Sequence, residues 1–155
     1  MNAATPTDHR SEGFTLIEIM AVVLIIGMLS GIVGFAVFQQ VDKARVVTAR
    51  AQISRLESSL ELYSMDNGRF PSSEQGLDAL INKPSGSPEP TNYQPGGYLK
   101  GGELPKDPWG FEFQYANPGA NNAESFDLWS FGKDGTTGGD ELDADIGNWS
   151  ASDGG

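Results

Sequence analysis

Two places in this chain carry side chains whose chemistry needs an explanation. The first is Glu18, a single carboxylate at the front of an apolar stretch. From Ile19 to Phe38 there are 20 residues without one charged side chain. A carboxylate at membrane depth costs about 2.5–3.5 kcal/mol at a helix centre, and by default it indicates a function. Glu18 is therefore a candidate functional residue.

The second place is the segment Gly132–Gly147, which holds five acidic residues among Gly and Thr. Carboxylates this close repel one another unless a cation joins them. Calcium takes six to eight oxygen ligands, from carboxylates and carbonyls in flexible loops. The spacing is not that of an EF-hand, and the closing Glu is missing. The residues alone leave two interpretations open, a calcium site and a solvated acidic loop.

Composition argues against several other classes of site. The chain has no Cys, so disulfides and thiolate metal sites are impossible. The only His is His9, close to the N-terminus, which argues against His-based catalytic triads and the usual zinc ligands. The net charge of −11 does not suggest nucleic-acid binding. We therefore expect neither an enzyme nor a nucleic-acid-binding protein.

The apolar run Ile19–Phe38 must position Glu18. As a helix it spans about 30 Å, the thickness of the hydrocarbon core of a bilayer. It is longer than the roughly 7–15 apolar residues of a secretory signal peptide, and no small-residue cleavage site follows it. A membrane-spanning helix fits the length. A plain membrane anchor, however, leaves Glu18 unexplained.

The helix is expected to continue from Phe14 to Met65, because Gln39–Met65 contains neither Gly nor Pro. Asn67-Gly68 then supplies a C-terminal stop. Apolar residues recur in this segment at alternating spacings of four and three, which places them on one face of the helix. We expect this face to pack on the protein's own lobe; its residues are Ala49, Ile53, Leu56, Leu60 and Tyr63.

The rest of the lobe is expected to cover that face. Ser72 and Gln75 have capping-box spacing, which predicts a short amphipathic helix next. Residues 84–97 are rich in Pro, Gly and Ser and are typical of an exposed loop. Alternating apolar residues predict strands over 111–115 and 126–131. These strands would form a small antiparallel sheet.

Gly13-Phe14-Thr15-Leu16-Ile17-Glu18 resembles the processing site of type IV prepilins and type II secretion pseudopilins. In that family a membrane peptidase cuts after the Gly, and the new N-terminal Phe is methylated. The resemblance implies a cut between Gly13 and Phe14, methylation of the Phe14 amine, and a need for Glu18 in assembly. Phe14 and Glu18 are neighbours on one helix, and Glu18 could also meet the amine of the next subunit.

Three further motifs resemble the major (G-type) pseudopilins of bacterial type II secretion systems: Glu74–Leu77, Leu104–Gly110 and Asp143–Trp149. The resemblance implies an α+β fold of the type IV pilin-like class. A long N-terminal α-helix would pack on a small antiparallel β-sheet, with a C-terminal calcium-binding loop. The implied parts are a cleaved leader over residues 1–13, a transmembrane and filament-core helix over 14–38, and a periplasmic lobe over 39–155.

The resemblance also favours the calcium interpretation of the acidic segment. It implies Ca²⁺ as the cofactor, with Asp134, Asp143 and Asp145 as side-chain ligands. Backbone carbonyls of Phe131 and Thr136 would complete the set of ligands. The loop length varies within the family, so the choice between Asp140 and Asp145 stays open.

We expect the chain to be a structural subunit that polymerises into a periplasmic pseudopilus. Expected partners are copies of itself, minor pseudopilins, the prepilin peptidase and methyltransferase, the inner-membrane assembly platform, and membrane lipid. The expected location is the bacterial inner membrane, with one span and a periplasmic lobe. Charge bias alone does not decide this topology, because basic residues after the span outnumber Arg10 before it. Two alternatives are a type IV pilin and a monomeric membrane-anchored calcium-binding module.

Overall fold

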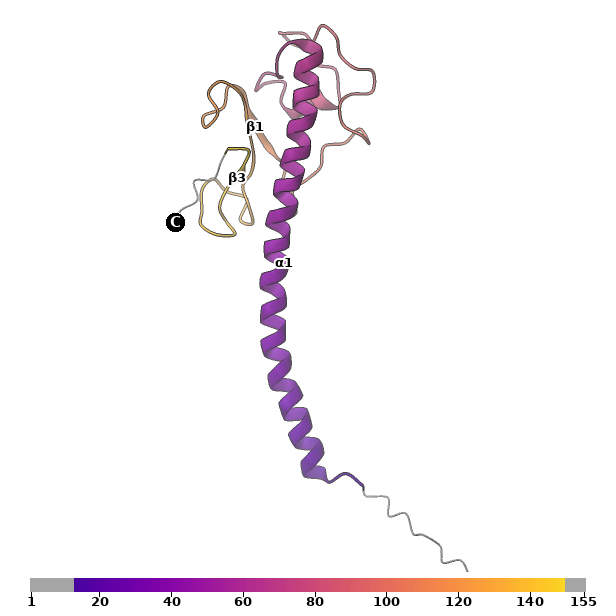
Figure 1. Ribbon diagram of the computed structural model, residues 1–155, viewed down its shortest axis with the longest axis vertical. Helices are drawn as coiled ribbons and strands as arrows, with labels where there is room; N and C mark the ends of the chain where they lie inside the picture. Colours follow the sequence, from indigo (N-terminus) through magenta and orange to yellow (C-terminus); the bar gives the residue numbers. More distant parts are fainter. Residues whose placement is uncertain (1–12, 150–155) are drawn as a thin grey trace, which may run out of the picture. The chain divides into compact units, whose positions relative to one another are not determined.

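The computed structural model describes residues 13–149, without the side chains of residues 32–39. The expected leader lies outside the described residues, apart from Gly13. The chain separates into two compact units, Met1–Gln40 and Val41–Gly155. The second one contains the sheet and the loops of the lobe (Figure 1).

Helix α1 runs from Leu16 to Asn67. The expected span, Phe14–Met65, is therefore shifted by two residues at each end. The C-terminal stop is confirmed: Gly68 has a left-handed φ of 74°, and its N–H donates to the Ser64 carbonyl at 2.7 Å. A residue without a Cβ adopts this conformation at no steric cost, which is why Gly commonly ends helices.

The apolar face of the second part of α1 is the centre of the lobe, as expected. Its five residues are between 0% and 3% exposed, whereas Leu62 on the same helix is 52% exposed. Each large side chain buried in this way contributes about 1.5–3 kcal/mol relative to its exposed state. The residues that complete this core are Leu77, Ala79, Leu80, Tyr98, Leu99, Phe113, Phe126, Leu128 and Ile146.

Three short strands form an antiparallel sheet in the order β1-β2-β3. They are β1 (Gln114–Ala116), β2 (Asp127–Ser130) and β3 (Ile146–Gly147). In the register of the sheet, Trp129 pairs with Gln114 on one side and with Gly147 on the other. Within the lobe, β1 and β3 lie on the same side of α1 (Figure 1).

The strand predictions were right about position but wrong about extent. The N–H groups of Trp109 and Phe111 donate to the buried carboxylate of Asp107, so this part of the first predicted strand belongs to a turn. Glu112 forms only an isolated bridge with Lys106. Strand β3 was not predicted. Its two residues carry too little alternation to give a periodic signal.

The predicted short helix is present as the 3₁₀ helix η1 (Leu77–Leu80). Ser72 and Gln75 do exchange the hydrogen bonds of a capping box, at 3.0 and 3.2 Å. They do not cap η1, because Gly76 lies between Gln75 and the first residue of η1, with a φ of 57° and a ψ of −163°. That backbone conformation is open almost only to Gly, and it separates the capped turn from the helix.

The end of α1 is tied to the following loop by Asn67, which is 7% exposed. Its amide Nδ2 donates to the Tyr63 carbonyl at 2.9 Å and to the Tyr98 hydroxyl at 3.1 Å. Its Oδ1 accepts from the N–H of Asn92 at 3.0 Å. One buried side chain therefore connects the helix end with two positions of the loop.

We expect Asn67→Ala to lower the free energy of unfolding by about 1–3 kcal/mol, since it leaves buried polar groups without partners. The matched control is Asn82→Ala, which removes an exposed amide bonded to Asp78. The control should stay within about 0.5 kcal/mol of the unmodified chain. Urea unfolding followed by tryptophan fluorescence measures both. Equal losses would contradict a special role for Asn67.

Candidate functional site

The first candidate group lies at the start of α1, where Thr15 and Glu18 bind each other. Glu18 Oε2 accepts hydrogen bonds from the Thr15 backbone N–H at 3.1 Å and from the Thr15 hydroxyl at 3.0 Å. The Glu18 N–H donates to Thr15 Oγ1 at 3.3 Å. This reciprocal pair is a capping box, and it satisfies N–H groups that have no partner within the helix.

Sequence reasoning missed the part played by Thr15, although the spacing Thr-x-x-Glu was visible. Glu18 therefore already has a local role, which is to cap its own helix. Gly13 and Phe14 precede the first helical residue, and Phe14 is 83% exposed. A cut between them would place an ammonium group on the residue next to Thr15. The carboxylate of Glu18, in the first turn of α1, would then lie four residues along the chain from that charge.

The membrane-spanning prediction covers residues 14–38. Where side chains are described, over 13–31 and 40–149, no helix is both long enough and apolar enough to cross a bilayer. Residues 32–38 of the predicted span lie outside the residues whose side chains are described.

The second candidate group is the acidic loop, defined as residues 131–147. The N–H of Lys133 donates to the Leu142 carbonyl at 3.1 Å, so the two ends of the loop meet there. At Gly132, an added Cβ would lie 2.8 Å from the Ala144 carbonyl oxygen. The backbone of the loop is thus folded tightly on itself. Carbonyl oxygens gather near its closure.

The predicted ligands are only partly brought together. Asp134 accepts hydrogen bonds from the hydroxyl of Thr136 at 2.7 Å and from its N–H at 3.0 Å. These bonds lower the pKa of Asp134. Asp145 Oδ2 accepts from the N–H of Gly138 at 3.1 Å. Over residues 13–149, no three acidic side chains are grouped closely enough to hold a metal ion by themselves.

Asp145 is the predicted ligand that fits a cation best. Its second oxygen, Oδ1, is buried and has no hydrogen-bond partner. A buried carboxylate oxygen without a partner carries a free-energy cost that a bound cation would remove. The set of donors, carboxylates together with loop carbonyls, is the one that calcium prefers. The residues of the loop therefore fit calcium, provided that backbone oxygens supply most of the ligands.

A further contact ties the acidic loop to α1. Lys133 Nζ lies 3.0 Å from Asp42 Oδ2, and Arg45 lies 3.6 Å from the other oxygen of Asp42. The Asp42 side chain is only 17% exposed, so this pair is better shielded from solvent than a fully exposed one. No sequence signal predicted this contact, because 91 residues separate the partners.

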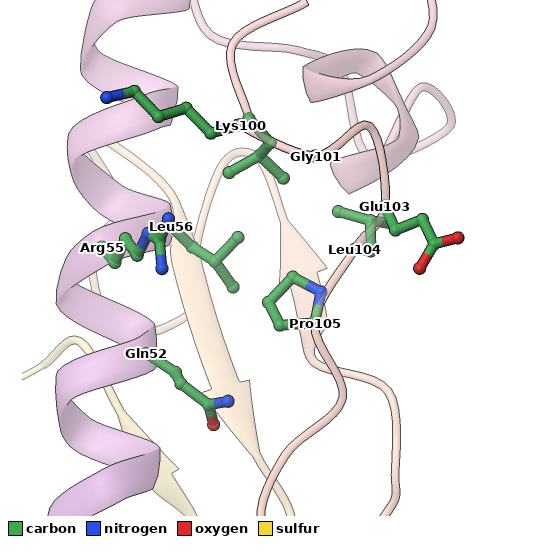
Figure 2. Close-up of a pocket in the computed structure, with 9 residues that line it drawn as sticks. Gln52, Arg55, Leu56, Lys100, Gly101, Glu103, Leu104 and Pro105 are labelled. Carbon is green, nitrogen blue, oxygen red and sulfur yellow. The ribbon is translucent and has the colours of Figure 1, made fainter.

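A surface pocket of about 320 Å³ lies between α1 and the segment 99–105 (Figure 2). Its apolar side chains are those of Leu56, Leu99, Leu104 and Pro105. Gln52 Nε2 donates to the Lys106 carbonyl at 3.2 Å. Lys100 extends toward α1, whereas the carboxylate of Glu103 is turned away from the helix (Figure 2). None of the sequence-predicted site residues lines this pocket.

The family model described as "Type II secretion system (T2SS), protein G" matches residues 36–149. The chain belongs to this protein G family of type II secretion systems. A model described as "Prokaryotic N-terminal methylation motif" matches residues 8–34. The two matches meet near the boundary between the two units and cover most of the chain.

Curated members of the protein G family are similar along nearly their whole length. The core protein G of Pseudomonas aeruginosa is 48% identical over 141 residues, which are 91% of this chain and 96% of that protein. The core proteins G of Aeromonas hydrophila and Vibrio cholerae are each 44% identical over 145 residues, or 94% of this chain. The resemblance predicted from the sequence motifs is confirmed.

A solved structure supports the same assignment. The crystal structure of the major pseudopilin from the type 2 secretion system of enterohaemorrhagic Escherichia coli has a TM-score of 0.62 and 42% identity. The match covers 74% of this chain and 94% of that one. The α+β pseudopilin fold is confirmed, with a long N-terminal helix and a small antiparallel sheet. This protein G chain is a structural protein of type II secretion.

Proposed function

We propose that this chain is the major pseudopilin subunit that polymerises into a periplasmic pseudopilus and supports protein export across the outer membrane. The observation that carries the proposal is the pair of family matches, a methylation motif over residues 8–34 and a protein G lobe over 36–149. The lobe supports it as well, since the apolar face of α1 is covered by the chain's own sheet and loops.

The N-terminal segment is proposed to supply the filament core. Residues 16–31 of α1 belong to the unit that ends at Gln40, and their large apolar side chains are exposed, for example Leu16 at 80% and Met28 at 68%. Apolar surface of this extent calls for either lipid or other copies of the same helix. Both environments are proposed in turn: the inner membrane before assembly, with a single span and a periplasmic lobe, and the filament afterwards.

The proposed partners follow from this sequence of steps. A prepilin peptidase and methyltransferase would act at Gly13 and Phe14, and the inner-membrane assembly platform would receive the processed chain. Copies of the chain and minor pseudopilins would form the filament. The sequence has 21 acidic residues and 10 Lys and Arg residues, which gives a net charge of −11. Contacts between lobes must therefore place the few basic residues opposite acidic ones.

The decisive experiment for processing is the intact mass of the chain purified from membranes that contain the complete secretion machinery. We expect the loss of residues 1–13 and the gain of one methyl group on the Phe14 amine. The control is the same chain produced without the peptidase, which should keep its full mass. A full-length mass in the presence of the machinery would overturn the pseudopilin proposal and leave a membrane-anchored acidic domain.

We also propose that the acidic loop binds Ca²⁺. Asp134, Asp143 and Asp145 are the proposed side-chain ligands, together with the backbone carbonyls of Phe131 and Thr136. The unpartnered Asp145 Oδ1 supports this proposal most directly. The ion would supply positive charge that lets the loop carboxylates approach one another. Asp140 is the alternative to Asp145, but its carboxylate belongs to an exposed residue, whereas Asp145 is half-buried.

A further inference from the structure

Asp107 is a buried carboxylate whose hydrogen bonds extend beyond the turn in which it lies. It is 4% exposed, and the groups that donate to it are neutral. Oδ1 accepts from the N–H groups of Trp109 at 3.0 Å and Phe111 at 2.8 Å. Oδ2 accepts from the hydroxyl of Ser130 at 2.5 Å. Each oxygen thus holds a different part of the lobe.

The Oδ2 contact leads to the closure of the acidic loop. Ser130 is fully buried, and its hydroxyl also accepts from the N–H of Gly132 at 3.1 Å. Gly132 has a φ of 75° and lies against the carbonyls of Leu142 and Ala144. The path from Asp107 through Ser130 therefore ends where the two ends of the loop meet.

The Oδ1 contact leads to the middle of the acidic loop. It fixes the backbone of Phe111, whose ring lies over Gly135 so closely that an added Cβ would be 2.6 Å from the ring. Gly135 is adjacent to Asp134, a proposed calcium ligand. Phe111 is itself 41% exposed, so its position depends on the backbone bond to Asp107 more than on burial.

We propose that Asp107 is the positioning residue of the acidic loop, holding Gly132 through Ser130 and covering Gly135 through Phe111. One consequence rests on the proposed calcium function: the affinity of the loop for Ca²⁺ depends on Asp107. Replacing a residue that hydrogen-bonds to metal ligands without binding the metal itself typically weakens metal affinity by about 10–100-fold. Asp107 has this place in the lobe without lying in the loop.

Asp127→Asn is a matched control for Asp107→Asn. Asp127 is 2% exposed and also accepts only from neutral donors, the N–H groups of Asn121 and Asn122 at 2.7 and 2.9 Å and the amide of Asn121 at 3.0 Å. These hydrogen bonds lower the pKa of Asp127 although burial acts to raise it. Its bonds hold the turn before β2 and do not reach the acidic loop. Both variants exchange a buried carboxylate for an amide.

The experiment uses the full chain in detergent micelles, first without calcium. Amide hydrogen exchange is measured at Lys133 and Gly138, whose N–H groups bond within the loop. We expect Asp107→Asn to speed exchange at both by roughly tenfold or more, because the loop opens locally. Asp127→Asn should leave them nearly unchanged even where it lowers global stability. Equal effects of the two variants would overturn the inference.

Calcium titration calorimetry at a temperature where all variants are folded gives the second measurement. Asp107→Asn should weaken the affinity by about 10–100-fold, and Ser130→Ala, which keeps the Phe111 contact, by less. Asp127→Asn should bind like the unmodified chain. An Asp107→Asn variant with unchanged affinity would overturn the inference. If the unmodified chain bound no calcium, the calcium proposal would fail, and the exchange measurement would still decide the role of Asp107.

Discussion

Replacing Glu18 by alanine is expected to abolish assembly of the chain into filaments, and replacing it by glutamine is expected to do the same. The two variants separate two roles of the side chain. Alanine removes both the negative charge and the capping box with Thr15. Glutamine removes only the charge, since Gln serves as well as Glu at this position of a capping box.

The expected loss with glutamine follows from the energy of charges in an apolar environment. After the proposed cut, the Phe14 amine is positive, and a carboxylate opposite it offsets much of the cost of moving both out of water. A neutral amide cannot do so. The amine would then enter the filament core unpaired, at a cost of several kcal/mol. The capping bonds are worth only about 1 kcal/mol by comparison.

The measurement is the amount of sheared filament recovered from cells that overproduce the secretion machinery. Glu124→Gln, which changes an exposed carboxylate of the lobe in the same way, is the control and should assemble normally. The melting temperature of the lobe should be unchanged in both Glu18 variants, because Glu18 lies in the first unit. Normal assembly of Glu18→Gln would mean that Glu18 acts as a helix cap alone.

Removal of calcium is expected to lower the melting temperature of the lobe by about 10 °C. An ion present at a hundred times its dissociation constant stabilises the folded state by about 2.7 kcal/mol. For a domain of about 100 residues, each kcal/mol shifts the melting temperature by about 4 °C. The lobe has no disulfide and only a small core, so a bound ion is a large part of its total stability.

Asp145→Asn should remove most of this response to calcium. The amide keeps an acceptor for the Gly138 N–H, so the calcium-free fold is retained, but the negative charge at the buried oxygen is lost. Asp134→Ala should lose the response as well. Asp78→Asn, an exposed acid in η1, is the control and should respond like the unmodified chain. Differential scanning calorimetry with calcium and with chelator measures the melting temperatures of the unmodified chain and the three variants. An undiminished response to calcium in Asp145→Asn would remove Asp145 from the ligand set.

Much of the lobe could be predicted because its strongest signals are local. The apolar face of α1 was readable from spacings of three and four, and every predicted member is buried. The stop at Asn67-Gly68 was readable because only a few residues tolerate left-handed backbone. The family motifs likewise lie in short continuous stretches. Local sequence carries information of this kind without any knowledge of what packs against it.

The acidic loop marks the limit of that reasoning. Its five carboxylates indicated a cation but could not say which of them point inward, because that depends on how the loop closes at Gly132. The closure depends on Ser130 and Asp107, which lie in two other segments of the chain. The ion pair between Lys133 and Asp42 joins residues 91 positions apart. Short strands such as β3 also form only where a neighbouring strand supplies the partner.

The sequence by itself determined the long helix, its apolar face, the position of the single carboxylate and the membership in the protein G family. These depend on residue type and spacing, which are properties of the chain. Only the tertiary structure decided that Asp145 rather than Asp140 has a buried oxygen without a partner, and that Asp107 holds the acidic loop from outside it. Burial and hydrogen-bond partners are set by segments that meet only when the chain folds, so no local pattern contains them.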